Sequence, residues 1–229
     1  DLVPLCYFNI IKLKAGESYN YQLADYETCI VPATGSIDVQ VQNQTFKQVG
    51  KRQHIWERDP EGVYVPVNCE ATIYCISEEV EVFISGAKHN QTHKAFVIRE
   101  DDIDTVQYGS DDTKTHRKIK HILGKGPAGD VGKLLVSELF TVGAGGWSGF
   151  PPHKHETDRL PEESRHNEVY NFRFNPPHGF GAIPGNGLAA VVSARCKTSV
   201  EGRCEDQPRL HGRRSQLHFD GDLLHLDRW

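Results

Sequence analysis

The sequence predicts an all-β protein, a sandwich or a barrel, made of two similar units in tandem. Short segments rich in Val, Ile, Tyr and Phe recur between turns of Gly, Pro, Asn and Asp, which is typical of short antiparallel strands. The first half contains no stretch with a helical period over ten residues, so a parallel sheet with crossover helices is disfavoured. A length of 229 residues suits two domains of about a hundred residues each.

Five strands are expected in the first half, and two of them alternate apolar with polar residues in part. Residues 37–41 read Ile-Asp-Val-Gln-Val and residues 80–84 read Val-Glu-Val-Phe-Ile, as in strands with one buried face. The expected strands are residues 28–31, 37–41, 63–66, 71–76 and 79–84.

A polar, aspartate-rich stretch from Glu100 to Lys114 is expected to be a solvated surface loop that connects the halves. Strands are expected again at residues 118–123 and 133–142. From Ala182 onward the sequence reads poorly as strands, with one apolar run at residues 188–192. Residues 196–214 have almost no alternating pattern, so this tail is expected to be a loop or disordered.

Composition and charge argue against several classes of function. A net charge of -5 without a basic stripe gives no reason to expect a nucleic-acid partner. No run of eighteen apolar residues occurs and the start at Asp1 has no signal-peptide pattern, so we expect no membrane partner and a cytoplasmic location. The six cysteines lack C-x-x-C spacing and are expected to be reduced thiols rather than ligands of a zinc knuckle.

A candidate metal site follows a Pro-Pro corner at residues 151–152. His153 and His155 are two residues apart, a spacing that points both imidazoles to the same face of a strand. Glu168 opens a strand-like segment thirteen residues later and could add a carboxylate. Two imidazoles and a carboxylate suit zinc, manganese, iron or nickel, with open positions for water or substrate. The alternative is that both histidines lie in an exposed loop.

Several motifs in this region resemble those of the 5-deoxyglucuronate isomerase family of inositol catabolism. They are WSGFPPHKHETD at residues 147–158, PEES at 161–164, EVY at 168–170, RFNPP at 173–177 and GF at 179–180. Supporting matches are LKAGES at 13–18, GKR at 50–52, ER at 57–58, VYVP at 63–66 and HIL at 121–123. Together the matches cover roughly residues 8–181.

The resemblance implies two tandem cupin domains, which are double-stranded β-helices of the jelly-roll type, at residues 1–112 and 113–229. The first would be metal-free and the second would bind a divalent metal through two histidines, a glutamate and a later histidine. The first three ligands correspond to His153, His155 and Glu168. The family's turn around the fourth ligand is missing here. Among His211, His218 and His225, we assign the fourth position to His225, which follows a Gly-Asp pair similar to the family's.

The resemblance also implies an aldose-ketose isomerase that converts 5-deoxy-D-glucuronate to 5-dehydro-2-deoxy-D-gluconate. Its cofactor would be a divalent metal ion, its partner a small sugar-acid substrate, and its state a homo-oligomer. Candidates for proton transfer are Glu163 and Tyr170, and Arg173 is the candidate for the substrate carboxylate. Their structural alternatives are a solvated loop acid, a core aromatic and a surface ion-pair partner, respectively.

Two other functions stay open. The missing fourth-ligand turn favours a binding protein or a catalytically impaired cupin, and the same scaffold also supports other cupin enzymes such as dioxygenases. The first half lacks a His-x-His motif and is expected to have a structural or oligomer-forming role. His89, Asn90 and His93 lie close together there, and we expect them to form a polar loop.

Overall fold

Strands dominate the computed structural model, which describes residues 3–124, 132–143, 145–147, 157–159, 161–163, 165–175 and 177, and the backbone of 180–184, 189–193 and 214–220. Within these residues the helical element is a single 3-10 turn, η1 (Glu100–Asp102). The prediction of an all-β protein is therefore confirmed. Among the described residues, no helix is long and apolar enough to cross a membrane.

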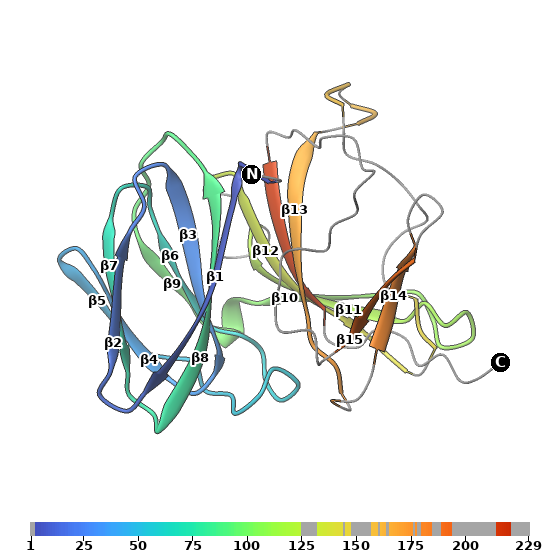
Figure 1. The fold of residues 1–229 in the computed structure, drawn as a ribbon, viewed down its shortest axis with the longest axis horizontal. Coiled ribbons are helices and arrows are strands. Elements are labelled where there is room, and N and C mark those ends of the chain that lie inside the picture. Colours follow the sequence, from blue (N-terminus) through green and yellow to red (C-terminus); the bar gives the residue numbers. More distant parts are fainter. Residues whose placement is uncertain are drawn as a thin grey trace.

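The N-terminal part of the chain forms two antiparallel sheets that face each other (Figure 1). All five strands expected in this half are present within them. The first sheet has the order β1 (Cys6–Lys14), β8 (Glu79–Lys88), β3 (Tyr26–Thr34), β6 (Gly62–Val65) and β9 (Phe96–Ile98). The second has the order β2 (Ser18–Gln22), β7 (Glu70–Cys75), β4 (Ile37–Val41) and β5 (Gln44–Val49).

A core of branched aliphatic side chains fills the space between these two sheets. In β4, Ile37, Val39 and Val41 are buried and alternate with the more exposed Asp38 and Gln40. Because successive side chains of a strand point to opposite faces, this alternation fixes which face of β4 is turned inward. Burial of each such side chain contributes about 1.5–3 kcal/mol. We refer to the two sheets and their core as the N-terminal sandwich.

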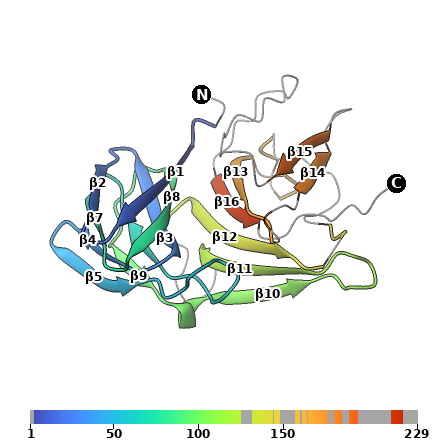
Figure 2. The same ribbon diagram turned by 60° about the horizontal axis from the view of Figure 1, so that its bottom comes forward.

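The inner strands of the first sheet, β8, β3 and β6, are buried on both faces. In β3, Ile30 belongs to the core of the N-terminal sandwich, whereas Cys29 and Val31 pack into a second core together with Ile122 and Leu134. This second core lies between the first sheet and the sheet formed by the second half (Figure 2). The near-continuous burial of β3 and β8 follows from this middle position in a three-layer arrangement.

The sheet of the second half has the order β10 (Asp104–Tyr108), β11 (Arg117–Leu123), β12 (Leu134–Thr141), β16 (Arg214–Asp220) and β13 (His166–Phe172). The expectation of a solvated loop from Glu100 to Lys114 is wrong in part, because β10 lies inside this stretch and pairs with β11. The chain reaches β10 through η1. The predicted domain boundary at residue 112 stays a prediction.

The expectation that the tail forms few strands is also wrong in part. A hairpin of β14 (Phe180–Pro184) and β15 (Ala189–Ser193) contains most of the apolar run at residues 188–192. Strand β16 lies between β12 and β13 and is parallel to both, unlike the antiparallel pairs elsewhere in the described sheets. The β-branched valines of β15 and the period-2 sequence Ser-Gln-Leu-His-Phe of β16 are consistent with strands.

Two buried polar contacts connect the first half of the chain to β12, one through Arg52 between β5 and β6 and one through Glu27 of β3. Arg52 forms a bidentate pair with Glu138, both about 1% exposed, and its Nε donates to the carbonyl of Pro32 at 3.3 Å. In β3, one carboxylate oxygen of Glu27 accepts the backbone N–H groups of Lys133 and Leu134, where β12 begins. The other oxygen accepts the hydroxyl of Tyr64 at 2.7 Å. These contacts fix the position of β12 against the N-terminal sandwich.

Candidate functional site

Of the four predicted metal ligands, Glu168 is the one that the structure describes. Glu168 is the third residue of β13 and is half-buried. His153, His155 and His225 lie outside the described residues. Among the residues that are described, no group of three or more His, Cys, Asp or Glu side chains is positioned to hold a metal ion. His218 occupies β16, where its backbone is in register with Tyr170 of β13.

The alternation of β13 separates its candidate site residues from the core. Asn167, Val169 and Asn171 are buried, and Val169 belongs to the core shared with the N-terminal sandwich. Glu168 and Tyr170 therefore lie on the opposite face of the strand. Tyr170 is 44% exposed and its ring packs against that of Phe172, so it differs from the core aromatic considered as its alternative. The strand thus presents a carboxylate and a phenol on one face.

Glu163, the other candidate for proton transfer, lies in a tight turn after the His-x-His segment. One carboxylate oxygen accepts the backbone N–H of Thr157 at 2.9 Å, and the other pairs with Arg159 at 3.2 Å. The side chain is 9% exposed, which differs from the solvated loop acid considered as its alternative. The carboxylate of Glu163 therefore holds Thr157 and Arg159 in place.

Arg173 lies against the N-terminal sandwich. Its Nη2 pairs with Glu81 of β8 at 3.2 Å, its Nε donates to Asn171 at 3.1 Å, and its guanidinium lies 5.3 Å from the ring centroid of Phe83. This arrangement agrees with the alternative of an ion-pair partner. The structure does not bring Arg173 to the face of β13 that bears Glu168, and a role in binding the substrate carboxylate stays a prediction.

The expected polar loop after β8 contains a buried histidine. His89 is 8% exposed, its backbone N–H donates to the carbonyl of Asp25, and its Nε2 lies 3.2 Å from Nε2 of His93. Residues 89–95 form no helix or strand, in agreement with the expected loop, but His89 is buried and its ring stacks on that of His93. The spacing of the two histidines was visible in the sequence, but nothing in it indicated burial.

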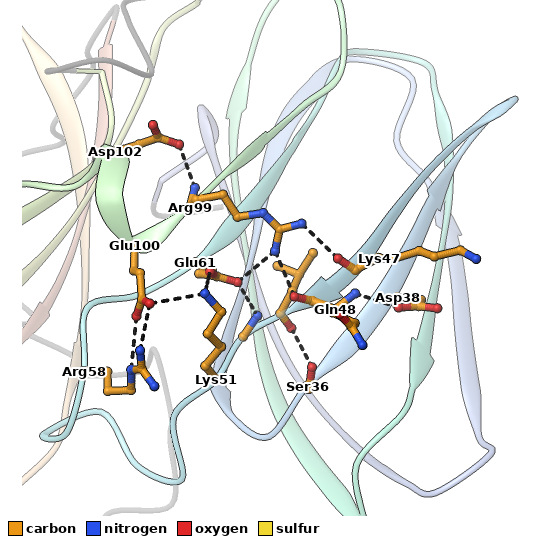
Figure 3. Close-up of polar contacts among 12 residues, drawn as sticks. Ser36, Asp38, Lys47, Gln48, Lys51, Arg58, Glu61, Arg99, Glu100 and Asp102 are labelled. Atoms are coloured by element: carbon orange, nitrogen blue, oxygen red, sulfur yellow. Dashed lines mark hydrogen bonds and ion pairs between the residues drawn. The ribbon is translucent and has the colours of Figure 1, made fainter.

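A polar pocket of about 470 Å³ lies at one end of the N-terminal sandwich. Four separate segments line it, which explains why no sequence motif pointed to it. Figure 3 shows the polar side chains in and around it. The lining residues are Ser36, Lys47, Gln48, Gly50, Lys51, Ile76 and Arg99. We call this cavity the basic pocket, since three of its lining residues are cations.

Glu61 lies behind the basic pocket and orients its cations. Its side chain is 1% exposed and accepts the backbone N–H of Gly50 at 2.9 Å, while Lys51 and Arg99 each lie 3.0 Å from one of its oxygens. Burial alone would raise the pKa of this carboxyl, but the Gly50 N–H, Lys51 and Arg99 outweigh it and lower the pKa below its ordinary value. Glu61 is therefore held as a carboxylate.

A second acid, Glu100, joins the same network at the surface. Its carboxylate pairs with Lys51 at 3.2 Å and with Arg58 at 2.8 Å. The hydrogen bond from Lys51 and the pairing with Arg58 lower the pKa of Glu100. Conversely, hydrogen bonds to Glu61 and Glu100 raise the pKa of Lys51. Each charge thus stabilises the charged form of its neighbours.

Comparison with known proteins places the chain in a family. The KduI/IolB family pattern matches residues 2–187. A 5-deoxy-glucuronate isomerase of Bacillus velezensis is 36% identical over 177 residues, which are 76% of this chain and 62% of that protein. One of Geobacillus kaustophilus is 32% identical over 174 residues, 76% of this chain and 61% of that protein. The chain thus spans about three fifths of the length of these curated relatives.

The fold has a counterpart among solved structures. The crystal structure of an IolB-like protein from Salmonella typhimurium superposes with a TM-score of 0.71 at 25% identity, covering 82% of this chain and 72% of that one. This likeness confirms the prediction of a cupin-like, all-β fold. Family pattern, relatives and fold agree, and the chain belongs to the KduI/IolB family.

Proposed function

We propose that this protein is a metal-dependent isomerase that converts 5-deoxy-D-glucuronate to 5-dehydro-2-deoxy-D-gluconate. The observation that carries the proposal is the match, across 76% of the chain, to relatives named 5-deoxy-glucuronate isomerase. The position of Glu168 supports it, because the residue lies half-buried on the face of β13 turned away from the shared core.

The chemistry requires a proton to move between two neighbouring carbons of the sugar. The C2–H of an aldose is a poor acid. The enediolate that forms when this proton is removed must therefore be stabilised electrostatically. A divalent ion held by imidazole and carboxylate side chains would supply this stabilisation as a Lewis acid. A base within hydrogen-bond reach of the C2 proton completes the requirement.

The donor set proposed for the metal is His153, His155, Glu168 and His225. Imidazole and carboxylate are suitable donors for zinc, manganese, nickel or iron, and Glu168 fits because strand alternation turns it away from the core. Val169, on the opposite face, packs into the shared core and would keep the strand from shifting. A buried neighbour of this kind supplies the rigidity that a metal ligand needs.

Tyr170 is the better placed of the two candidates for proton transfer. It lies on the same face of β13 as Glu168 and is 44% exposed, so a substrate could approach its hydroxyl. The side chain of Glu163 is only 9% exposed, and its carboxylate accepts the N–H of Thr157 and pairs with Arg159. We therefore propose that Tyr170 transfers the proton and that Glu163 holds the turn, with Arg173 kept as a candidate for the substrate carboxylate.

Metal content and turnover of four variants test the proposal. We expect near-stoichiometric divalent metal in the wild type by inductively coupled plasma mass spectrometry, and its loss in the His153→Ala/His155→Ala double variant. Separate His218→Ala and His225→Ala variants identify the fourth ligand. Tyr170→Phe should keep its metal and lose at least tenfold in kcat. A Tyr170→Phe variant with wild-type kcat would refute its role in proton transfer.

The missing fourth-ligand turn specifically favours a second function, that of a binding cupin without catalysis. A folded wild type that takes up no metal after incubation with zinc, manganese, nickel or iron would support this second function and exclude the isomerase. Metal-bound protein that consumes oxygen instead of isomerising the sugar would indicate a dioxygenase.

A further inference from the structure

We propose that the basic pocket binds a small hydroxylated metabolite through an oxyanion, either a carboxylate or a phosphate group. The pocket is formed by segments that join strands of the N-terminal sandwich, by β5, and by Arg99, which lies between β9 and η1. The proposal does not depend on the isomerase activity, and it assigns a binding role to the half of the chain that lacks a His-x-His motif.

The charges of the lining residues favour an anion. Lys47, Lys51 and Arg99 are cationic, and none of the seven lining residues is acidic. The acids of the network lie outside this lining. No ion pair or hydrogen bond is made by the ammonium of Lys47 within the described residues, where its side chain is exposed. A cation without a carboxylate partner at a pocket wall is available to a ligand.

The guanidinium of Arg99 is already held in place. Its Nη1 donates to the carbonyl of Gln48 and to Glu61, and its Nη2 donates to the carbonyl of Lys47. Its Nε–H makes no hydrogen bond to any described residue, and its side chain is 36% exposed. A ligand would thus meet a donor whose rotamers are already restricted, which lowers the entropic cost of binding.

Lys51 is held in the same way and keeps a free donor. Its ammonium lies 3.0 Å from Glu61 and 3.2 Å from Glu100, and its side chain is 46% exposed. An ammonium has three N–H donors, so one remains for a ligand at the pocket. Figure 3 shows Lys51 between the two acids, with Arg99 on the far side of Glu61. Glu61 therefore serves to position the two cations.

The backbone at Gln48 is strained where it borders the pocket. Gln48 has a φ of 54°, in the left-handed region that a non-glycine residue seldom adopts. Asp38 accepts its backbone N–H at 2.8 Å and Arg99 donates to its carbonyl at 2.8 Å, so contacts on both sides hold the strained conformation. The conformation coincides with a shift in the register between β4 and β5. The result is an amide side chain and the Ser36 hydroxyl beside three cations.

The composition of the lining defines the ligand class. A volume of about 470 Å³ lies within the range of sites for small metabolites. The cations match an oxyanion, while the Gln48 amide and Ser36 hydroxyl match neighbouring hydroxyl groups. The alternative is a purely structural network, in which Glu61 and Glu100 already satisfy Lys51 and Arg99, and which predicts no ligand.

Calorimetric titration of the full chain with three probes decides between these alternatives. The probes are D-glucuronate for the carboxylate, inorganic phosphate for the phosphate, and D-glucose as a neutral control. We expect at least one anion to bind and glucose not to bind, and the stronger of the two anions identifies the source of the charge. Absence of anion binding up to about ten millimolar would overturn the proposal.

A matched pair of charge reversals locates the binding. Lys47→Glu alters the pocket, whereas Lys14→Glu makes the same charge change at an exposed lysine of β1 outside it. We expect Lys47→Glu to weaken binding at least tenfold and Lys14→Glu to change it less than twofold. The His153→Ala/His155→Ala variant should bind the anion normally. Equal affinities in both reversals, or loss of binding only in the histidine variant, would refute the assignment to this pocket.

Discussion

At the scale of residues, buried charge is concentrated where the N-terminal sandwich meets β12. The Arg52–Glu138 pair is almost fully excluded from water, and Glu27 is completely buried. Burying an ion is costly unless every hydrogen-bonding position is satisfied. Here the bidentate geometry and the carbonyl of Pro32 satisfy Arg52, and three donors satisfy Glu27.

Removal of one partner from the Arg52–Glu138 pair should be far worse than removal of both. We expect Arg52→Met or Glu138→Leu alone to lower the free energy of unfolding by roughly 3–5 kcal/mol, because each leaves an uncompensated buried charge. The double variant should be more stable than either single variant. Urea denaturation checks this, with Arg58→Ala as a half-exposed control that changes stability little. Additive effects in the double variant would contradict the coupling.

The stability of the protein should depend on pH through Glu61. Its pKa is lower in the folded protein than the ordinary value of 4.5, so its stabilising contribution is complete above that value and is lost as pH falls through the folded pKa. We expect the Glu61→Gln variant to be less stable than the wild type at pH 7, with the difference narrowing toward pH 3. Thermal unfolding measures this, and the exposed Glu79→Gln is the control. A difference that is constant with pH would contradict the expectation.

Among the strands, β12 starts at a close contact between the backbone of Gly132 and the side chain of Glu27. A Cβ added at Gly132 would overlap with the carboxylate of Glu27. That carboxylate cannot move away easily, since it accepts hydrogen bonds from Lys133, Leu134 and Tyr64. The strand is therefore fixed to β3 by a contact that requires a glycine.

We expect Gly132→Ala to destabilise the protein by about 1–3 kcal/mol, because it displaces a buried, hydrogen-bonded carboxylate. Gly16→Ala is a suitable control for the loss of glycine, since its added Cβ meets no atom within 4 Å, although its φ of 81° adds some backbone strain. Chemical denaturation provides the comparison. If the two substitutions cost the same, the carboxylate contact is unimportant.

Strands with one buried face could be predicted from their alternation of apolar and polar residues. Strands that lack this alternation could not. Strand β4 was predictable because Ile37, Val39 and Val41 alternate with polar residues. Strand β10 was not, because acidic residues flank its short Asp-Thr-Val-Gln-Tyr segment, and pairing with β11 stabilises it.

The candidate sites divide in the same way. Glu168 could be predicted because it belongs to a contiguous motif, and the structure indeed places it on a strand. The basic pocket could not be predicted, since Ser36, Lys51, Ile76 and Arg99 come together only when the sheets pack. The burial of His89 likewise depends on tertiary contacts, including that with Asp25.

At the scale of the whole molecule, the two halves share a hydrophobic core. Phe83 from β8 and Val136 from β12 belong to this core, and the ring of Trp56 packs edge-on against that of Phe140 at a centroid distance of 5.8 Å. The first sheet therefore cannot separate from β12 without exposing apolar surface. We infer that the N-terminal sandwich and β12 unfold together.

We expect tryptophan fluorescence and far-ultraviolet circular dichroism to give coincident urea transitions, because a shared core makes unfolding cooperative. Phe83→Ala should cost about 3–5 kcal/mol and shift both transitions together. A fluorescence transition that clearly precedes the loss of strand signal would show that the two halves separate first.

We have proposed that this member of the KduI/IolB family isomerises a sugar acid. The most direct test is to incubate the metal-loaded protein with 5-deoxy-D-glucuronate and follow the anomeric and aldehyde protons by nuclear magnetic resonance. We expect these signals to decay as the ketose appears, and we expect no conversion by the His153→Ala/His155→Ala variant. Unchanged substrate with folded, metal-loaded wild type would contradict the claim.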